Sequence, residues 1–412
     1  MQIVHERCCG LDVHKKSVVA CVLLTRADGA VERKVRTFGT MTADLLALSD
    51  WLAELEVGQI ALESTGVYWR PVFNLLEGEG RTIVLVNPQH MKAVPGRKTD
   101  VKDSEWLADL LRHGLVRASF IPPAPIRELR ELTRYRKTLV RERGQETQRL
   151  QKLLESANIK LSAVVSNVLG ASGREMLQAL RDGEEDPQIL AEFARGKLRT
   201  KLPALRQALL GRVRPYHRIL LGELLAHITY LDDTITRLDA EIERHLVPFT
   251  DEVQLLTTIP GVSQIAAATL IAEIGVDMAR FPSARHLASW AGVCPGNRQS
   301  AGKRLSGKPT KGNAWLRAVL GEVAWAAART RDTYLRAQFE RLAKRRGRKK
   351  AIVAVGHSIL VIAYYLLRTR RPYTDLGLDY FDSQDTERIA RHHIQRLGQL
   401  GYTVTITPKE AA

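Results

Sequence analysis

The sequence contains few cysteines, and their arrangement argues against a metal-binding role. Four occur among 412 residues: Cys8, Cys9, Cys21 and Cys294. The paired spacing that is typical of a zinc site is missing. We therefore expect buried free thiols in a reducing cytoplasm.

Long apolar runs are also scarce. The first residues, MQIVHERCCGLD, lead directly into a strand pattern and lack the layout of a signal peptide. One apolar stretch, residues 350–373, has the length of a membrane span, but Gly356, His357 and Ser358 interrupt it and a basic segment precedes it. We predict a core helix there, and no association with a membrane.

Acidic residues are outnumbered by basic ones. The chain has 62 Lys and Arg against 45 Asp and Glu, a net charge of +17, and its isoelectric point is about 9.9. This balance indicates a partner of dense negative charge, most commonly nucleic acid, with a membrane surface as the alternative. The length allows two or three domains with substantial cores.

Residues 1 to about 118 show a mixed α/β pattern. The predicted strands are Cys8–Leu24, Glu32–Thr40, Gly58–Glu63 and Arg81–Val86, with the turn Arg26–Ala30 joining the first two. The predicted helices are Thr42–Leu55, Arg70–Glu79 and Ser104–Leu115. A hairpin followed by alternating strands and helices is what an RNase H-like fold requires, although composition equally allows a doubly wound sheet.

The proline-rich segment Phe120–Pro125 marks a boundary, because its prolines continue neither a helix nor a central strand. Helical patterns over about 126–159 and 203–245 predict an antiparallel coiled-coil arm with a helical insert, or else an ordinary bundle. Residues 257–275 then show a helix-hairpin-helix pattern. There Pro260 and Gly261 would let backbone N–H groups approach a phosphate, unless the segment is a plain turn between packed helices.

A basic segment without acids follows. From Arg298 to Arg317 there are six basic residues, interspersed with glycines and hydroxyl groups. We predict a loop that binds nucleic-acid phosphates, with a solvated basic loop as the alternative. The residues predicted to make these contacts are Arg298, Lys303, Arg304, Lys308 and Lys311.

Four carboxylates are the candidate catalytic groups. Asp100 and Asp103 stand at the start of a predicted helix, where a cap and a first-turn acid are the plain explanation. Asp12 and Glu63 lie in strand-like contexts. If all four converge, each pair at about 4 Å repels by roughly 1 kcal/mol in water and about 4 kcal/mol at an effective dielectric of 20. A bound Mg²⁺ ion is the simplest way to offset that repulsion.

Five motifs in this order resemble one known family. GLDVHKKS, ALESTGVYW, NPQHMKAVPGRKTDVKDSEWLADLLRHG, IPGVSQIAAATLIAEIG and the segment around Ser300 are similar to DEDD transposases of insertion sequences, which are bridge-RNA-guided recombinases. The resemblance implies that Asp12, Glu63, Asp100 and Asp103 bind Mg²⁺ and that Ser300 is the nucleophile. Many relatives are richer in glycine after the serine, whereas this chain has Ser-Ala-Gly, so Ser306 stays open as a substitute.

The resemblance also implies the partners and the layout. The partners would be donor and target DNA, a structured guide RNA and further copies of the chain in a dimer or tetramer. The fold would be an α/β RNase H-like (RuvC-like) N-terminal domain, a long helical coiled-coil arm, and an all-α C-terminal domain with the helix-hairpin-helix. The expected boundaries are 1–120 for the metal-binding domain, 126–250 for the arm, 251–376 for the serine-containing domain and 377–412 for a tail.

The expected activity is DNA cleavage and strand exchange through a covalent phosphoserine, in a cytoplasmic protein associated with the nucleoid. One alternative is a hydrolytic RuvC-like nuclease, such as a Holliday-junction resolvase, that uses water. A second alternative, a protein that packages DNA or RNA through its basic face, leaves the order of the carboxylates unexplained.

Overall fold

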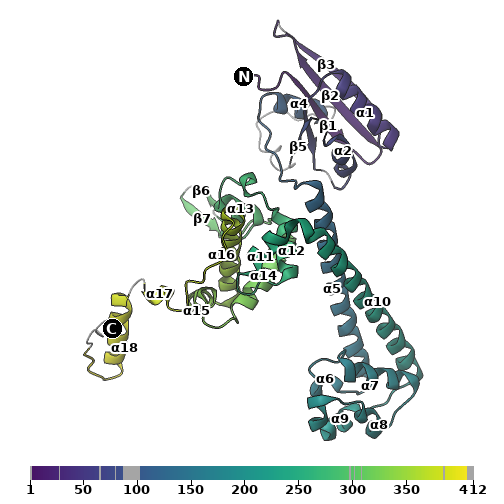
Figure 1. Ribbon diagram of the computed structural model, residues 1–412, viewed down its shortest axis with the longest axis vertical. Coiled ribbons are helices and arrows are strands. Elements are labelled where there is room, and N and C mark those ends of the chain that lie inside the picture. Colours follow the sequence, from purple (N-terminus) through teal and green to yellow (C-terminus); the bar gives the residue numbers. More distant parts are fainter. Residues whose placement is uncertain are drawn as a thin grey trace. The chain divides into compact units, whose positions relative to one another are not determined.

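The computed structural model describes residues 2–26, 28–64, 66–78, 80–86, 103–296, 298–300, 302–307, 309–383 and 386–405. The chain divides into two compact units, Met1–Ile121 and Pro122–Ala412. The first unit contains a five-stranded sheet, and the second is mostly helical (Figure 1). The predicted order, α/β followed by helical structure, is confirmed at this level.

The sheet of the first unit is mixed. Its strands are β1 (Arg7–Val13), β2 (Ser17–Thr25), β3 (Val31–Gly39), β4 (Gln59–Glu63) and β5 (Thr82–Val86). They lie in the order β3-β2-β1-β4-β5, with β1, β2 and β3 antiparallel and with β4 parallel to both β1 and β5.

The predicted strand Cys8–Leu24 is wrong in one respect, because the structure divides it into β1 and β2. The chain reverses between them, where His14 N donates a hydrogen bond to Ser17 O at 2.9 Å. The polar residues Lys15 and Lys16 occupy this turn, and the apolar strand pattern resumes after it. The predicted turn from Arg26 to Ala30 is confirmed, because Arg26 N donates a hydrogen bond to Ala30 O at 2.9 Å between β2 and β3.

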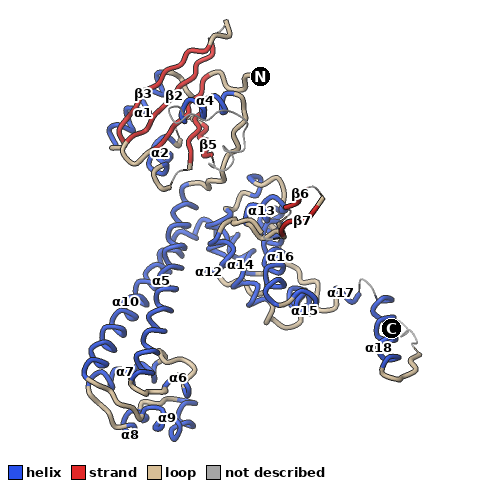
Figure 2. The backbone as a smooth tube through the Cα atoms, turned by 180° about the vertical axis from the view of Figure 1, so that it is seen from behind, coloured by secondary structure: helices blue, strands red, loops and turns tan. Residues whose placement is uncertain are grey.

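Helices cover both faces of this sheet (Figures 1 and 2). Helices α1 (Thr42–Glu54) and α2 (Trp69–Leu76) pack on one face through the side chains of Leu11, Ile60 and Leu62. Helix α4 (Asp103–Arg112) packs on the other face, in a smaller apolar cluster. The members of that cluster are Cys8, Cys21, Leu23, Ala61, Val86, Leu107, Ala108 and Leu111.

Two long helices dominate the first part of the second unit. Helices α5 (Ala124–Ser156) and α10 (Pro215–Leu246) run antiparallel, since Arg136 near the start of α5 pairs with Asp239 near the end of α10, and Ser156 at the end of α5 lies 3.2 Å from His217. The segments between them fold into a small cluster with its own core. Its helices are α6 (Leu161–Val164), α7 (Ala171–Asp182), α8 (Pro187–Glu192), η1 (Gly196–Lys201) and α9 (Leu202–Leu209).

The predicted helical segment 203–245 is therefore two helices, α9 and α10. The break falls at Gly211, where a Cβ atom would lie 2.4 Å from the carbonyl oxygen of Ala157. Pro215 then starts α10 in the first-turn position that tolerates proline.

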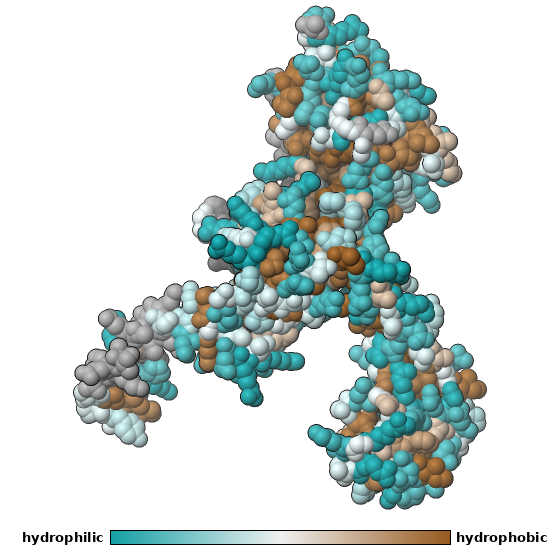
Figure 3. All heavy atoms as spheres, viewed as in Figure 1, coloured by the Kyte–Doolittle hydropathy of each residue, from teal (hydrophilic) through white to brown (hydrophobic). Residues whose placement is uncertain are grey.

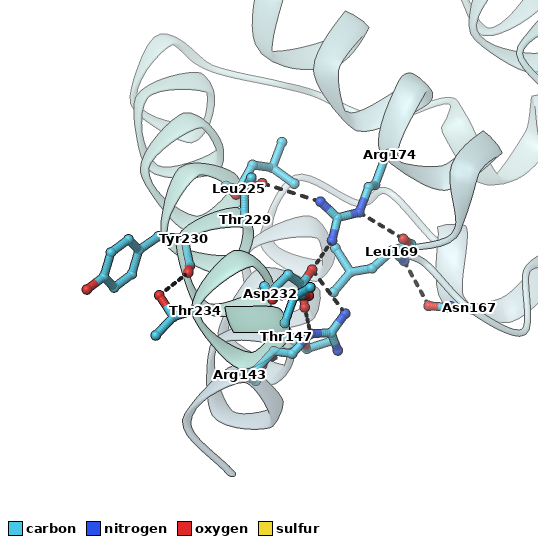
Figure 4. A network of polar contacts seen from close by, with 11 residues as sticks. Arg143, Thr147, Asn167, Leu169, Arg174, Leu225, Thr229, Tyr230, Asp232 and Thr234 are labelled. Carbon is cyan, nitrogen blue, oxygen red and sulfur yellow. Dashed lines mark hydrogen bonds and ion pairs between the residues drawn. The ribbon is translucent and has the colours of Figure 1, made fainter. Parts of the chain in front are cut away.

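A polar network joins the two long helices to the insert (Figure 4). Asp232 of α10 accepts hydrogen bonds from Arg143 of α5 and from Arg174 of α7. Burial alone would raise the pKa of the Asp232 carboxyl, but the hydrogen bonds and charges of the two arginines lower it below its ordinary value. Arg174 also donates to Leu169 O at 3.0 Å, which ties the loop before α7 to the same point.

Helix α16 (Arg348–Thr369) is the core of the remaining helical part. It contacts α11, α13, α14 and α15 and buries residues along its whole length. These neighbours are α11 (Thr250–Thr257), α13 (Ala284–Ala291), α14 (Ala314–Ala327) and α15 (Tyr334–Arg346). Among the described helices, α16 alone is long and apolar enough to cross a membrane, and its packing is that of the predicted core helix.

Short elements complete the second unit. Helix α12 (Gln264–Ile274) follows α11 in the chain and contacts α5, α11 and α14. The strands β6 (Arg298–Ser300) and β7 (Lys303–Ser306) form a two-stranded sheet. The C-terminal residues form α17 (Tyr380–Ser383) and α18 (Thr386–Gln399).

Candidate functional site

Asp12 and Glu63 lie side by side on the sheet. In the parallel pairing of β1 with β4, Leu11 is opposite Leu62, so the next position in register places Asp12 beside Glu63, on strands that are about 4.8 Å apart. Leu11 and Leu62 pack toward α1 and α2. Because side chains alternate along a strand, Asp12 and Glu63 both face α4.

Asp103 belongs to the same end of this face. Cys8 Sγ lies 3.5 Å from Ala108 O, and a Cβ atom on Gly10 would lie 2.2 Å from Ser104 O. Successive α4-facing positions of β1 thus track back along the helix, so the end of β1 that carries Asp12 is the end at which α4 begins, at Asp103. Asp103 Oδ1 is shielded from solvent. Three of the four predicted carboxylates therefore lie at the same end of the sheet.

The surroundings of these carboxylates are only partly exposed. Asp12 has a side chain 24% exposed, and its Oδ2 lies 3.1 Å from His14 Nε2, a partner that the sequence did not predict. Asp100 lies outside the described residues. Among the residues that are described, no three His, Cys, Asp or Glu side chains form a ready-made group for a metal ion. The four-carboxylate set therefore stays a prediction.

The predicted basic loop contains a β-hairpin. Ser300 pairs with Lys303 at the tip, next to Gly302 with φ of +75°, whereas Ser306 pairs with Arg298 at the base. The two candidate serines thus occupy opposite ends of the hairpin. The side chains of Arg298, Ser300, Arg304 and Ser306, and all of Lys308, lie outside the described part of the chain.

The two ends of this segment, residues 292 and 312, touch each other. A Cβ atom on Gly292 would lie 2.8 Å from the Cα atom of Gly312, and one on Gly312 would lie 2.3 Å from the Ala291 carbonyl oxygen. Both glycines have positive φ, +72° and +48°. Gly296 N donates to Gly307 O at 3.2 Å nearer the hairpin. We call residues 293–313 the serine loop.

The predicted helix-hairpin-helix segment forms α11, a short turn and α12. Gly261 has φ of +87°, and a Cβ atom there would lie 2.5 Å from Ala327 N of α14. Close packing against α14 is therefore enough to require glycine at position 261, whether or not the turn binds phosphate. Ser263 caps α12 by accepting a hydrogen bond from Ala266 N at 3.3 Å. Phosphate binding by Pro260 and Gly261 stays a prediction.

Sequence reasoning missed one charged residue near the serine loop. Glu273 of α12 has a completely buried side chain and binds Arg134 and Asn313. The available signal was a single acid inside the apolar run LIAEIG, because a buried carboxylate requires partners elsewhere in the chain.

Two family models match the chain. One, described as a transposase, matches residues 9–159, and the other, described as the transposase IS116/IS110/IS902 family, matches residues 253–340. Together they cover more than half of the sequence and contain Asp12, Glu63, Asp103 and Ser300. The chain belongs to the IS116/IS110/IS902 transposase family. The predicted family is thereby confirmed.

Curated relatives agree with this family. An insertion element IS116 protein of Streptomyces clavuligerus is 26% identical, over 81% of this chain and 88% of its own length. A putative transposase of Sinorhizobium fredii is 28% identical, over 76% and 74%. A pilin gene-inverting protein of Moraxella bovis is 32% identical over 36% of this chain, and the match spans about half, 47%, of that relative.

Proposed function

We propose that this transposase cleaves and exchanges DNA strands of an insertion sequence by means of a serine nucleophile and a carboxylate-bound Mg²⁺. The observation that carries the proposal is that Asp12, Glu63 and Asp103 stand at the same end of the sheet, in a chain whose second family match includes the serine segment. The strand order β3-β2-β1-β4-β5 supports an RNase H-like identity for the first unit. Transposition and gene inversion, named for the relatives, are both DNA rearrangements.

The donor set fits a hard divalent cation. Oxygen ligands are what Mg²⁺ prefers, and close carboxylates are costly unless a cation offsets their repulsion. Asp12, Glu63 and Asp103, with Asp100, would hold the ion. When bound, it would neutralise charge that develops on the phosphoryl group.

The covalent step assigns a role to the serine loop. The Ser300 oxygen attacks the scissile phosphorus, a serine–phosphate bond forms, and the bond from phosphorus to the leaving DNA oxygen breaks. The serine loses its proton, and the leaving oxygen takes one up as a free hydroxyl. Exposed Lys303 and Lys311, with the other basic residues of the loop, would bind phosphates on either side. Attack by that hydroxyl on the ester of another strand reverses the step and joins strands without ATP.

The partners follow from the same assignment. Donor and target DNA are the substrates, and the +17 charge suits a structured guide RNA as well. Assembly as a dimer or tetramer, in the nucleoid of the cytoplasm, completes the proposal. Pro260 and Gly261 would contact the DNA backbone.

A nicked suicide substrate tests the function. Wild-type protein with Mg²⁺ should form a protein–DNA adduct that survives denaturation and disappears with protease, because a serine nucleophile stays attached to one DNA end. Ser300→Ala should bind the substrate and form no adduct, and Asp103→Asn should behave likewise. Ser306→Ala is the matched control and should retain the adduct.

Two outcomes would redirect the proposal. An adduct that persists in Ser300→Ala and disappears in Ser306→Ala would move the nucleophile to the base of the hairpin. Clean cutting by the wild type with no adduct at any time would indicate a hydrolytic nuclease that uses water.

A further inference from the structure

The Glu273 carboxylate is a buried junction of three elements. Arg134 of α5 donates two hydrogen bonds to it, from Nε to Oε1 at 2.7 Å and from an Nη nitrogen to Oε2 at 2.8 Å. Asn313 Nδ2, at the end of the serine loop, donates to Oε2 at 2.6 Å. Glu273 is 0% exposed, so these charge-assisted bonds form away from water.

Asn313 connects this junction to the helix that follows the serine loop. Its Oδ1 accepts hydrogen bonds from Trp315 N at 3.0 Å and Leu316 N at 3.1 Å, so the residue caps α14 while its amide nitrogen binds Glu273. Gly312, the residue before it, packs on the Ala291 carbonyl at the other end of the loop. Asn313 therefore lies next to the point at which the two ends of the serine loop meet.

Arg130 strengthens the connection between α5 and α12. Its Nε donates to Ala272 O at 2.8 Å and an Nη nitrogen donates to Glu273 O at 2.9 Å. The Arg134 guanidinium also lies 5.7 Å from the ring of Trp315, in the first turn of α14. One arm helix thus contacts both the carboxylate and the helix that follows the serine loop.

We propose that Glu273 is a positioning residue that holds the serine loop in register with arm helix α5. This inference rests on the proposed function, because it assigns the loop its catalytic serine. Interfaces made of buried, directional hydrogen bonds are discrete rather than continuously deformable, so a displacement of α5 would be passed to Asn313. The arm would therefore influence the site at which Ser300 acts.

Hydrogen exchange of peptides from residues 293–313 tests the inference independently of catalysis. In Glu273→Gln, Arg134 loses its charged acceptor, and a buried group left without its partner shifts a local equilibrium by about 5- to 150-fold. We expect loop exchange to rise within that range. Asn313→Asp keeps an acceptor for capping α14 but replaces the donor to Glu273 with a second carboxylate. It should loosen the loop while the first turn of α14 stays protected.

Asp232→Asn is the matched control, because Asp232 is also held by two arginines but lies in the arm (Figure 4). It should change exchange in α7 and α10 and leave the serine loop unaffected. Equal loosening of the loop in this control, or unchanged loop exchange in folded Glu273→Gln, would overturn the inference. If Glu273→Gln fails to fold, the exchange of Asn313→Asp decides whether the inference holds. If the first turn of α14 exchanges faster together with the loop in that variant, Asn313 acts only as the cap of α14, and the inference fails.

Adduct formation separates the two proposals. With the suicide substrate, both variants should lose adduct while Asp232→Asn keeps it. If the wild type forms no adduct, the proposed chemistry fails, and the exchange results still decide whether Glu273 positions the loop.

Discussion

Gly10 sets the distance between the sheet and α4. A Cβ atom on it would lie 2.2 Å from Ser104 O and 2.5 Å from Ala108 N, both backbone atoms that have no freedom to rotate away. Since Asp103 begins the same helix and Asp12 follows Gly10 by two positions, the absence of a side chain here controls how closely these carboxylates approach.

Gly10→Ala should therefore displace α4 and lower the stability of the first unit by about 1–3 kcal/mol, the usual cost of overpacking. Thermal unfolding measures the loss, and strand cleavage in Mg²⁺ should fall more than the unfolding accounts for. Gly58→Ala is the control, because a Cβ atom on Gly58 would meet nothing within 4 Å. Equal melting temperatures for the two variants would show that α4 accommodates the methyl group.

The cysteines illustrate what composition predicts well. All four are free, and Cys8, Cys9 and Cys21 are buried as predicted, whereas Cys294, predicted to be buried as well, is only partly buried. Burial raises the pKa of Cys8 to about 12, so the thiol is protonated at neutral pH. Cys8 Sγ instead packs on α4, at a hydrogen-bonding distance from the Ala108 carbonyl.

Helices and strands whose apolar residues recur at regular spacing were predicted nearly to the residue. Elements whose ends depend on contacts with distant parts of the chain were not. Helices α1 and α5 and strands β3 to β5 follow their sequence patterns closely. The β1–β2 turn was missed because it has only three polar residues, and the residues on both sides of them show the apolar pattern of a strand. The β6–β7 hairpin was missed because its sequence is polar and shows no alternation of apolar and polar residues.

The candidate site shows the same division. Strand and helix patterns were enough to place Glu63 and Asp103 at the ends of elements, whereas Asp12 fell inside a predicted strand that the structure divides into β1 and β2. Family resemblance selected all three. Asp12 lies beside Glu63 because of the register between β1 and β4. That register depends on contacts between strands far apart in the chain, which the residues of one strand do not reveal. Glu273 was missed for the same reason, since its partners are 40 and 139 positions away.

Helix α16 carries a histidine with a shifted pKa. Burial lowers the pKa of His357 below its ordinary value, so the folded chain favours the neutral ring. Above the ordinary histidine pKa of about 6.5, the ring is neutral in both the folded and the unfolded chain, and the folded state keeps its full stability. As the pH falls through 6.5 toward the lowered pKa, only the unfolded chain takes up the proton, so the free energy of unfolding decreases.

We expect the second unit to melt at a lower temperature at pH 5.5 than at pH 7.5, and His357→Gln to reduce that difference. Thermal denaturation followed by circular dichroism at both pH values measures it. His286 is a suitable control: its ring lies 2.8 Å from Ser283 Oγ in an exposed pair, and His286→Gln should leave the difference unchanged. A pH dependence that is identical in wild type and His357→Gln would assign the effect to other groups.

At the scale of the whole molecule, the excess of 17 positive charges is the property that most constrains partners. Hydrophilic side chains cover much of the visible face in Figure 3. Besides the serine loop, the last turn of α15 and the first turn of α16, on either side of Gly347, carry a compact run of exposed cations. These are Lys344, Arg345, Arg346, Arg348, Lys349 and Lys350.

Binding of DNA should therefore weaken steeply with salt. A protein that makes roughly six to ten phosphate contacts loses about 10³ to 10⁵ in affinity between about 50 and 200 mM salt, because counterions are released from the DNA. Fluorescence anisotropy with a labelled duplex at several salt concentrations gives the slope directly. A binding constant nearly flat over this range would contradict the assignment of nucleic acid as the partner.

The same titration can locate the cations that bind DNA. If the cations on either side of Gly347 bind phosphates, replacing Arg345 and Arg346 at the end of α15 with glutamine should reduce the slope by about 0.9 for each phosphate that is no longer neutralised. Arg181→Gln is the matched control, because Arg181 is an exposed cation already hydrogen-bonded to Asp182 at 2.6 Å, which raises its pKa. It should leave the slope unchanged. An unchanged slope in the double variant would confine phosphate binding to other cations, those of the serine loop first, since that loop combines basic residues with the proposed nucleophile.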